Sequence, residues 1–211
     1  MKVAVSGASG LVGRALCQIL KGDGHEVFPL VRRQPRSAGE IFWNPTNGEI
    51  DFKQLSSINA VVHLAGENIA DKRWTDTQKD KIRRSRVDAT RLLAKTIADC
   101  QPGPRVLVAV SAVGFYGDRG QEQLSETSLP GFGFLADLCR DWEESTEAAR
   151  AAGIRVVHPR IGVVLSREGG ALAKLLPIFQ LGGGGPIGAG QQYMSWIDIV
   201  DLARAMSLLL T

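Results

Sequence analysis

The sequence contains few cysteines, little net charge and no long apolar run, and each shortage narrows what the protein can be. Its three cysteines, Cys17, Cys100 and Cys139, are odd in number and widely spaced. They therefore show no metal-ligand pattern and indicate free thiols in a reducing compartment. The formal net charge of +3 gives no reason to expect nucleic acid or a membrane surface as partner. Because no apolar stretch reaches membrane length and no signal segment precedes the first predicted strand, we expect a cytoplasmic protein.

The rest of the composition is typical of an ordinary soluble globular domain. With 211 residues, 44% of them hydrophobic and 22% charged, the chain can bury a sizeable core and is most simply one domain. Lysines and arginines gather between Lys72 and Arg91. They lie on a predicted amphipathic helix, where we interpret them as a solvated face.

The first two dozen residues predict a phosphate-binding corner. An apolar strand, Lys2 to Ser6, is followed by glycines at positions 7, 10 and 13 and then by a helix that ends near Gly22. Gly7 permits a tight turn, Gly10 lets the backbone approach a pyrophosphate, and Gly13 allows close packing of helix and strand. The free N–H groups at the helix start attract phosphate charge. An ordinary glycine-rich turn is the alternative, but the position between a strand and a helix favours a dinucleotide site.

The end of the second predicted strand, His25 to Val31, favours NADP over NAD. Sites for NAD usually place a carboxylate there, about 20 residues beyond the glycines, to hold the ribose 2′-hydroxyl. This sequence has Arg32 and Arg33 instead, and guanidinium groups suit a 2′-phosphate. A solvated basic loop is the alternative interpretation.

Strands and helices continue to alternate, which predicts a Rossmann-like α/β fold with a doubly wound parallel sheet and helices on both faces. The predicted elements are a small hairpin over 41–50, strands over 59–66 and 105–111, and helices over 135–152, 171–181 and 199–210, with one long helix or a broken pair over 75–100. Residues 154–165 are predicted as a strand and its continuation, and Pro159 is expected to mark where the chain leaves the sheet. His63 lies in an apolar run and is interpreted as a core residue. Ser111 falls at a strand's carboxyl end, where its hydroxyl can donate to a substrate oxygen, with Tyr116 close behind. A strand-end cap is the alternative for Ser111.

Taken together, these pieces resemble the atypical extended short-chain dehydrogenase/reductases, in particular a nucleoside-diphosphate-sugar epimerase-like family. The similarity rests on motifs along the whole chain: Gly7-x-x-Gly10-x-x-Gly13, residues 63–70 (HLAGENIA), Ser85-Arg86-Val87, residues 111–117 (SAVGFYG), Asp141-Trp142-Glu143, residues 160–165 (RIGVVL), the glycine loop 182–188 and Trp196-Ile197-Asp198. The resemblance implies NADP as cofactor and a small-molecule substrate such as a sugar nucleotide. It implies that Ser111 is the catalytic serine, and we add Tyr116 as a second candidate catalytic residue. The expected cofactor-binding residues are Gly7, Ser9, Gly10, Leu11, Val12, Gly13, Arg32, Arg33, Leu64, Ala65, Gly66, Glu67, Arg86 and Arg160, with no metal.

The chain departs from this family where working members carry a Tyr-x-x-x-Lys pair, in which the lysine lowers the tyrosine pKa for proton transfer. Phe134 or Leu135 replaces the tyrosine and Leu138 or Cys139 replaces the lysine. Relatives place an asparagine where this chain has Arg86. They also continue beyond the last helix, so the resemblance implies an incomplete substrate lobe. They pair through helices that correspond to 75–100 and 135–152, which predicts a homodimer.

Two functions therefore compete. The first is an NADP-binding oxidoreductase or epimerase for a sugar nucleotide or small carbonyl, working without the Tyr-Lys pair. The second is a non-catalytic NADP-binding sensor or interaction module. We favour the first because the glycine loop within 182–188 implies a second ligand, and we expect parts of the substrate-binding region within 166–197 of the single domain 1–211. A serine hydrolase is disfavoured because the sequence has no Gly-x-Ser-x-Gly elbow.

Overall fold

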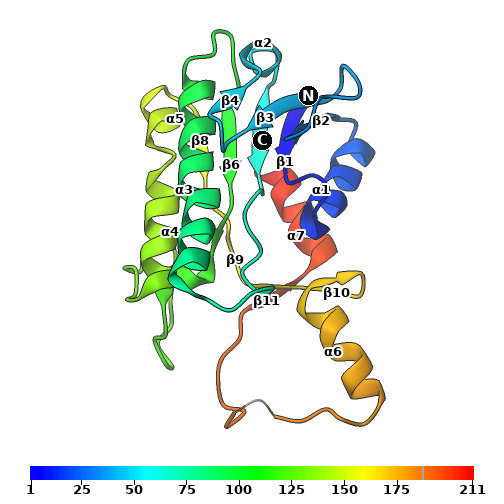
Figure 1. The fold of residues 1–211 in the computed structure, drawn as a ribbon, viewed down its shortest axis with the longest axis vertical. Helices are drawn as coiled ribbons and strands as arrows, with labels where there is room; N and C mark the ends of the chain where they lie inside the picture. Colours follow the sequence, from blue (N-terminus) through cyan, green and yellow to red (C-terminus); the bar gives the residue numbers. More distant parts are fainter. Residues whose placement is uncertain (187) are drawn as a thin grey trace.

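The computed structural model describes residues 1–186 and 188–211, and at their centre lies a seven-stranded sheet (Figure 1). The strands follow the order β4-β3-β2-β1-β5-β6-β8, and all neighbours are parallel except the hairpin pair β3 and β4. Their bounds are β1 Lys2–Ser6, β2 Glu26–Val31, β3 Ile41–Asn44, β4 Glu49–Ile50, β5 Ala60–His63, β6 Val106–Ala109 and β8 Arg155–Val157. This is the doubly wound order, with the crossover between β1 and β5 at its centre.

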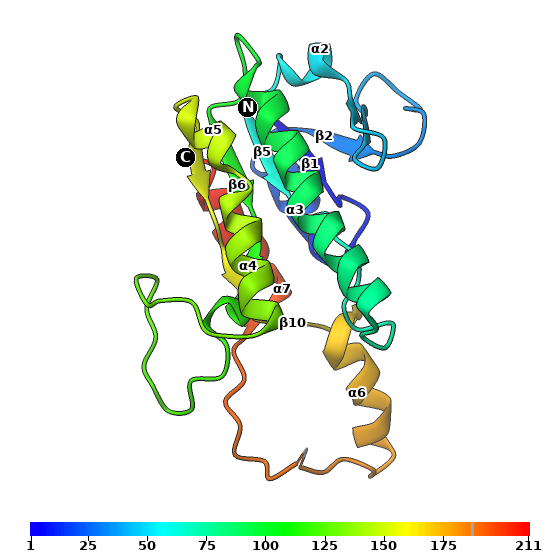
Figure 2. The same ribbon diagram turned by 60° about the vertical axis from the view of Figure 1, so that its left-hand side comes forward.

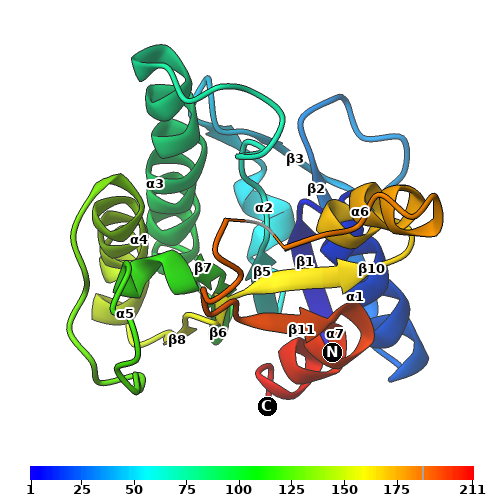
Figure 3. The same ribbon diagram turned by 90° about the horizontal axis from the view of Figure 1, so that it is seen from below.

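Helices cover both faces of the sheet, as Figures 2 and 3 show. One face carries α3 (Asp76–Ala98), α4 (Phe134–Glu144) and α5 (Glu147–Ala151), and the other carries α1 (Leu11–Gly22) and α7 (Ile199–Leu208). The short α2 (Phe52–Leu55) follows the hairpin. Along β1, Val3 and Val5 pack in one core cluster with Leu16 of α1, whereas Ala4 between them packs in a second cluster with Leu93 of α3. Burial on both sides encloses β1 and fixes the position of the loop that follows it.

Two predicted elements are divided in the structure. The helix expected over 135–152 is interrupted between α4 and α5, where the hydroxyls of Ser145 and Thr146 donate to the carbonyls of Trp142 and Glu143 (2.6 and 2.7 Å). Such bonds compete with the helical ladder. The strand and continuation predicted over 154–165 leave the main sheet before Pro159, as expected, because proline lacks the N–H that a continuous ladder needs. The continuation is itself divided into β9 (Arg160–Ile161) and β10 (Val163–Ser166).

This division creates a small second layer at the carboxyl end of the main sheet. There β7 (Ser111–Ala112) pairs in parallel with β9, so that Ser111 is opposite Arg160. Likewise β10 pairs with β11 (Trp196–Asp198). From β10 the chain enters α6 (Gly170–Gln180), which projects away from the body of the protein (Figure 1) and buries none of its side chains. Among the described helices, none has the length and apolar character needed to cross a membrane.

Candidate functional site

A large crevice of about 1090 Å³ opens at the carboxyl ends of β1, β2 and β5. One wall consists of residues 7–10 and 29–33, and the floor includes the loop 64–67 after β5. The opposite wall is the face of α3 that carries Lys81, Arg84, Ser85 and Asp88. The crevice therefore lies where parallel sheets of this order bind ligands, outside the strand ends at the point where the strand order reverses.

The glycine corner forms the phosphate end of this crevice. Gly7 has a φ of +68°, and its carbonyl accepts a bond from the N–H of Gly10 at 2.9 Å. A side chain at Gly13 would overlap the Gly7 carbonyl and lie 2.8 Å from the Cα of Ala8, so the close approach of α1 to the loop needs glycine there. Within the described residues the N–H groups of Leu11, Val12 and Gly13 have no partner, because α1 begins without a side-chain cap. Together they form a site for an anion.

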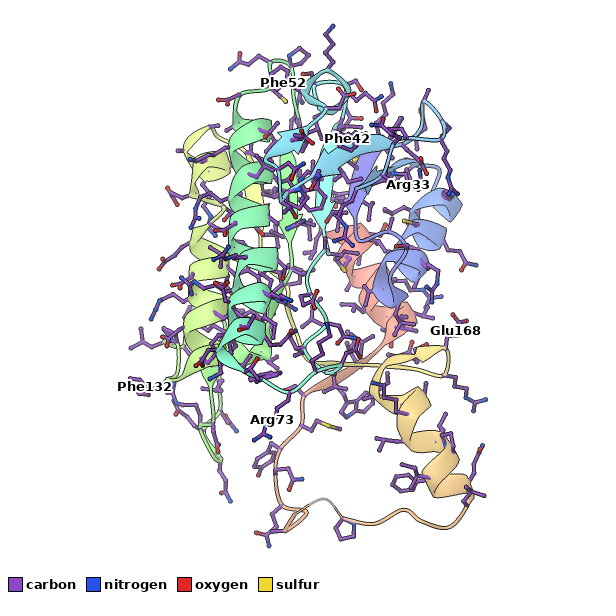
Figure 4. The ribbon with its side chains drawn as sticks, viewed as in Figure 1. Arg33, Phe42, Phe52, Arg73, Phe132 and Glu168 are labelled. Carbon is purple, nitrogen blue, oxygen red and sulfur yellow. The ribbon has the colours of Figure 1, made fainter. Side chains whose placement is uncertain are left out.

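Arg32 and Arg33 both line the crevice, but their surroundings differ. Figure 4 shows Arg33 beside the end of β2, on the side of the molecule that carries α1. Its guanidinium donates to both oxygens of Glu40, at 2.8 and 2.5 Å. These bonds and one from the Arg36 N–H lower the pKa of Glu40 to about 2. Arg32 makes no hydrogen bond or ion pair within the described part of the chain, so it is the guanidinium available to a ligand phosphate.

Glu40 and the basic face of α3 are the crevice residues that the sequence interpretation missed. Glu40 lies nine residues beyond β2, and the loop to β3 brings its carboxylate back to the crevice. Lys81 and Arg84 belong to the stretch interpreted as a solvated face, and the structure places them in the crevice wall. The available signal was their spacing of three residues within the predicted helix 75–100, which puts both side chains on one face.

Hydrogen bonds of the buried Ser6 hydroxyl fix the loop that follows β5. The Ser6 hydroxyl accepts bonds from the N–H groups of Leu64 and Ala65 (3.0 and 3.2 Å) and lies 2.6 Å from Nδ1 of His63. Since the oxygen already accepts twice, we assign its proton to the bond with Nδ1, which leaves the hydrogen of His63 on Nε2. That nitrogen has no hydrogen-bond partner among the described residues and lies close to Trp43, whose ring is edge-on to the imidazole. Burial, with the charge of Arg86, lowers the pKa of His63 to about 4.

A second polar cluster gathers around Ser111, Tyr116 and Arg160. Arg160 donates to both oxygens of Glu143 at 2.8 Å and to the hydroxyl of Tyr116 at 2.9 Å, and its guanidinium lies 3.5 Å from the centre of the Phe115 ring. The Glu143 bonds raise the pKa of Arg160. Burial acts to raise the pKa of Glu143, but the bonds from Arg160 outweigh it and the pKa is lowered. The pair is therefore ionised at neutral pH.

Ser111 is 3% exposed, and its hydroxyl makes no hydrogen bond of good geometry with the described residues. It nevertheless lies near enough to the Glu143 carboxyl and the Cys139 thiol that it acts to lower the pKa of each. A strand-end cap would use that hydroxyl on the backbone, so this arrangement favours a hydroxyl kept for a ligand. The short helix after Ser111, η1 (Val113–Tyr116), faces Leu135 and Cys139 of α4, because a Cβ on Gly114 would lie 3.4 Å from Leu135 and 3.8 Å from the Cys139 sulfur. Of the candidates for the Tyr-Lys positions, Leu135 and Cys139 are the ones that face η1. Burial raises the pKa of the Cys139 thiol.

The structure thus divides the predicted site residues into two groups. Arg86 lies between the groups, against Gly66 of the floor, and Tyr116, Ser111 and Arg160 lie in the second cluster, outside the crevice lining. No set of three histidine, cysteine or carboxylate side chains within residues 1–186 and 188–211 is arranged to hold a metal. The crevice lining brings together Gly7, Ser9, Gly10, Arg32, Arg33, Leu64, Ala65, Gly66 and Glu67, with Leu11, Val12 and Gly13 directly behind them at the start of α1.

Comparison with known proteins gives matches along the whole chain. Residues 3–211 match the model of the NAD dependent epimerase/dehydratase family. Epimerase family protein Mb2239 of Mycobacterium bovis is 45% identical over 97% of this chain and 67% of its own length. Human epimerase family protein SDR39U1 is 42% identical over 98% of this chain and 69% of its own. The chain thus spans about two thirds of the length of these relatives.

Solved structures repeat the fold closely. A nucleoside-diphosphate sugar epimerase from Corynebacterium glutamicum has a TM-score of 0.88 and 43% identity, over all of this chain and 43% of that one. The human SDR39U1 structure with NADPH has a TM-score of 0.85 and 37% identity, over all of this chain and 70% of that one. MoeE5 in complex with UDP-glucuronic acid and NAD has a TM-score of 0.81 and 26% identity, over all of this chain and 72% of that one.

Proposed function

The chain belongs to the NAD dependent epimerase/dehydratase family, and from this premise we propose that it binds NADP(H) in the crevice and acts on a sugar nucleotide or small carbonyl compound as an epimerase or oxidoreductase. In this proposal residues 1–211 form one nucleotide-binding domain. Residues 166–197 contribute to the substrate region, and α3 and α4 pair two copies.

The phosphorylated cofactor is supported above all by the charges at the end of β2. Arg32 lines the crevice without an ion-pair partner, and the nearby carboxylate of Glu40 is held by Arg33. A 2′-phosphate gains a charge-assisted bond from a free guanidinium, whereas a 2′-hydroxyl needs a carboxylate free to accept its proton. The structure of human SDR39U1 with NADPH agrees with this choice in a relative.

The reaction itself is proposed to take place at the second cluster, around Ser111, Tyr116 and Arg160. In the fold, Ser111 follows β6 at the carboxyl edge of the sheet, one strand beyond the floor of the crevice. Its hydroxyl can donate to a substrate oxygen. Tyr116, whose hydroxyl is held by Arg160, is the residue proposed to take the role of the missing tyrosine. MoeE5, which shares the fold at 26% identity, is complexed with UDP-glucuronic acid, and this supports sugar nucleotides as substrates to test first.

Leu135 and Cys139 favour a second candidate function. Neither side chain carries a proton that can move at neutral pH, because leucine has none and burial raises the pKa of the Cys139 thiol. A protein that binds NADP(H) and signals its bound state to a partner would need no such proton. This module remains the alternative to the enzyme.

The cofactor proposal is tested by titrating NADPH and NADH separately into the protein and its Arg32→Glu variant, with heat of binding as the readout. We expect the wild type to prefer NADPH. We expect the variant to lose roughly ten- to a hundred-fold in NADPH affinity, the equivalent of one or two charge-assisted bonds, with little change for NADH.

The matched control is Arg204→Glu, which makes the same charge change at an exposed position of α7. It should leave both affinities unchanged. Equal binding of the two cofactors by wild type and Arg32→Glu would remove the argument from the arginines. Tight NADPH binding without turnover of any sugar nucleotide or small carbonyl would favour the module over the enzyme.

A further inference from the structure

Arg86 is a half-buried cation between the crevice and Ser111 that has no carboxylate partner. It projects from α3 under the floor, where its Cζ would lie 3.1 Å from a Cβ placed on Gly66. All its hydrogen bonds come from Nη1, which donates to the Glu67 carbonyl at 3.0 Å and more weakly to Ile82 and Ser85. Its Nε and Nη2 have no acceptor among the described residues. The guanidinium is also 5.2 Å from the centre of the Trp142 ring.

The position of this cation is set by α4 as much as by α3. Trp142, which it faces, is three residues beyond Cys139 and on the same side of the helix. The guanidinium therefore lies between Gly66, after β5, and the Trp142 ring of α4. The positions are fixed on both sides: Trp142 is held by its N–H bond to Thr90 at 2.9 Å, and Gly66 leaves the space that the guanidinium occupies.

We propose that Arg86 holds the nicotinamide–ribose half of the bound dinucleotide through Nε and Nη2, so that α3 supplies the cation that α4 lacks at position 139. This inference rests on the proposed function. A half-buried guanidinium with two unused donors is stabilised by an electron-rich oxygen placed against it. The ribose hydroxyls and the carboxamide carbonyl supply such oxygens. Arg86 thereby completes the site at the end away from Arg32.

Two ligands separate this role from a structural one. NADPH carries both halves of the dinucleotide, whereas adenosine 2′,5′-diphosphate carries only the half that the crevice near Arg32 would hold. In the Arg86→Gln variant we expect NADPH affinity to fall by roughly ten-fold or more, as for loss of a charge-assisted hydrogen bond. Binding of adenosine 2′,5′-diphosphate should stay within about two-fold of wild type. Arg86→Lys, which keeps the charge, should recover part of the loss.

The matched control is Arg83→Gln on the same helix, whose guanidinium pairs with Asp141 outside the crevice lining. It should change neither affinity. Circular dichroism checks that each variant is folded. If Arg86→Gln is unstable, the Arg86→Lys variant is titrated with the same two ligands, and selective weakening of NADPH supports the proposal.

Equal weakening of both ligands would assign Arg86 to holding the floor through Gly66 and Glu67, and would overturn the inference. Unchanged NADPH binding in Arg86→Gln would overturn it as well. Failure of the wild type to bind either ligand is a different result, because it removes the proposed function itself.

Discussion

His63 makes the stability of this protein sensitive to mild acid, and the effect can be isolated. The imidazole is fully buried, Nδ1 accepts the Ser6 proton, and burial lowers its pKa from 6.5 to about 4. Protonating Nδ1 would require the Ser6 hydroxyl to accept a third bond. In the unfolded chain the same imidazole takes up a proton near pH 6.5. Between pH 6.5 and 4 the unfolded state therefore binds more protons, and the free energy of unfolding falls as the pH falls.

The size of the effect follows from the two pKa values. A difference of about 2.5 pH units at roughly 1.4 kcal/mol per unit gives a limit of about 3.5 kcal/mol, of which about 2 kcal/mol is lost by pH 5 and about 3 kcal/mol by pH 4. That is a large share of the stability of an ordinary domain, which is roughly 5–15 kcal/mol. The stability that Glu40 contributes is lost only below its unfolded pKa of 4.5, since its folded pKa is lowered to about 2, so it changes little between pH 7.5 and 5.

The assay is urea unfolding followed by far-ultraviolet circular dichroism at pH 7.5, 5 and 4, on wild type and on the His63→Gln variant. The pKa of His158 is also lowered by burial, so the wild type loses stability from two imidazoles. The variant keeps only the loss from His158. We expect the wild-type curve to fall more steeply, by about 2 kcal/mol between pH 7.5 and 5. Parallel curves for the two proteins would refute the argument.

Two further changes test the packing that positions the site. Gly13→Ala should lower the free energy of unfolding by roughly 1–3 kcal/mol, because the added methyl group would overlap the Gly7 carbonyl. The control is Gly22→Ala on the same helix, whose methyl group would meet no atom within 4 Å and should raise the free energy of unfolding by up to about 1 kcal/mol. Thermal melts compare the two variants. Thr90→Val should lower the free energy of unfolding, measured in urea, by roughly 1–3 kcal/mol, because it leaves the buried Trp142 N–H without its acceptor. Thr96→Val should lower it less, because the Thr96 hydroxyl donates only to a carbonyl of its own helix. Similar losses in each pair would contradict these explanations.

The fold and the phosphate corner could be predicted because their causes are local. The apolar run from Lys2, the glycines at 7, 10 and 13 and the helix after them are adjacent in sequence, and the structure has β1, the turn and α1 over the same residues. The hairpin over 41–50 likewise depended on its own turn residues and is confirmed as β3 and β4. The helix break at Ser145 was missed because it depends on which hydroxyls turn back onto the backbone.

The charge environment of the site could not be read from the sequence because it is made by distant residues. The sequence does not indicate that Arg33 has a partner, because the loop to β3 is what brings the Glu40 carboxylate against its guanidinium. Arg160 and Tyr116 are 44 residues apart, and only the pairing of β7 with β9 brings the guanidinium to the hydroxyl. Which residues of α4 face η1, Leu135 and Cys139 or Phe134 and Leu138, likewise depends on how the two helices pack.

The space above Gly66 ties two positions of the chain to each other over evolution. The guanidinium of Arg86 lies 3.1 Å from where the Cβ of any side chain at 66 would stand. A homologue with alanine at 66 must therefore either shift the guanidinium by a few tenths of an ångström or carry a shorter residue at 86. The two positions are thus expected to vary together, with glycine at 66 wherever the arginine keeps this place.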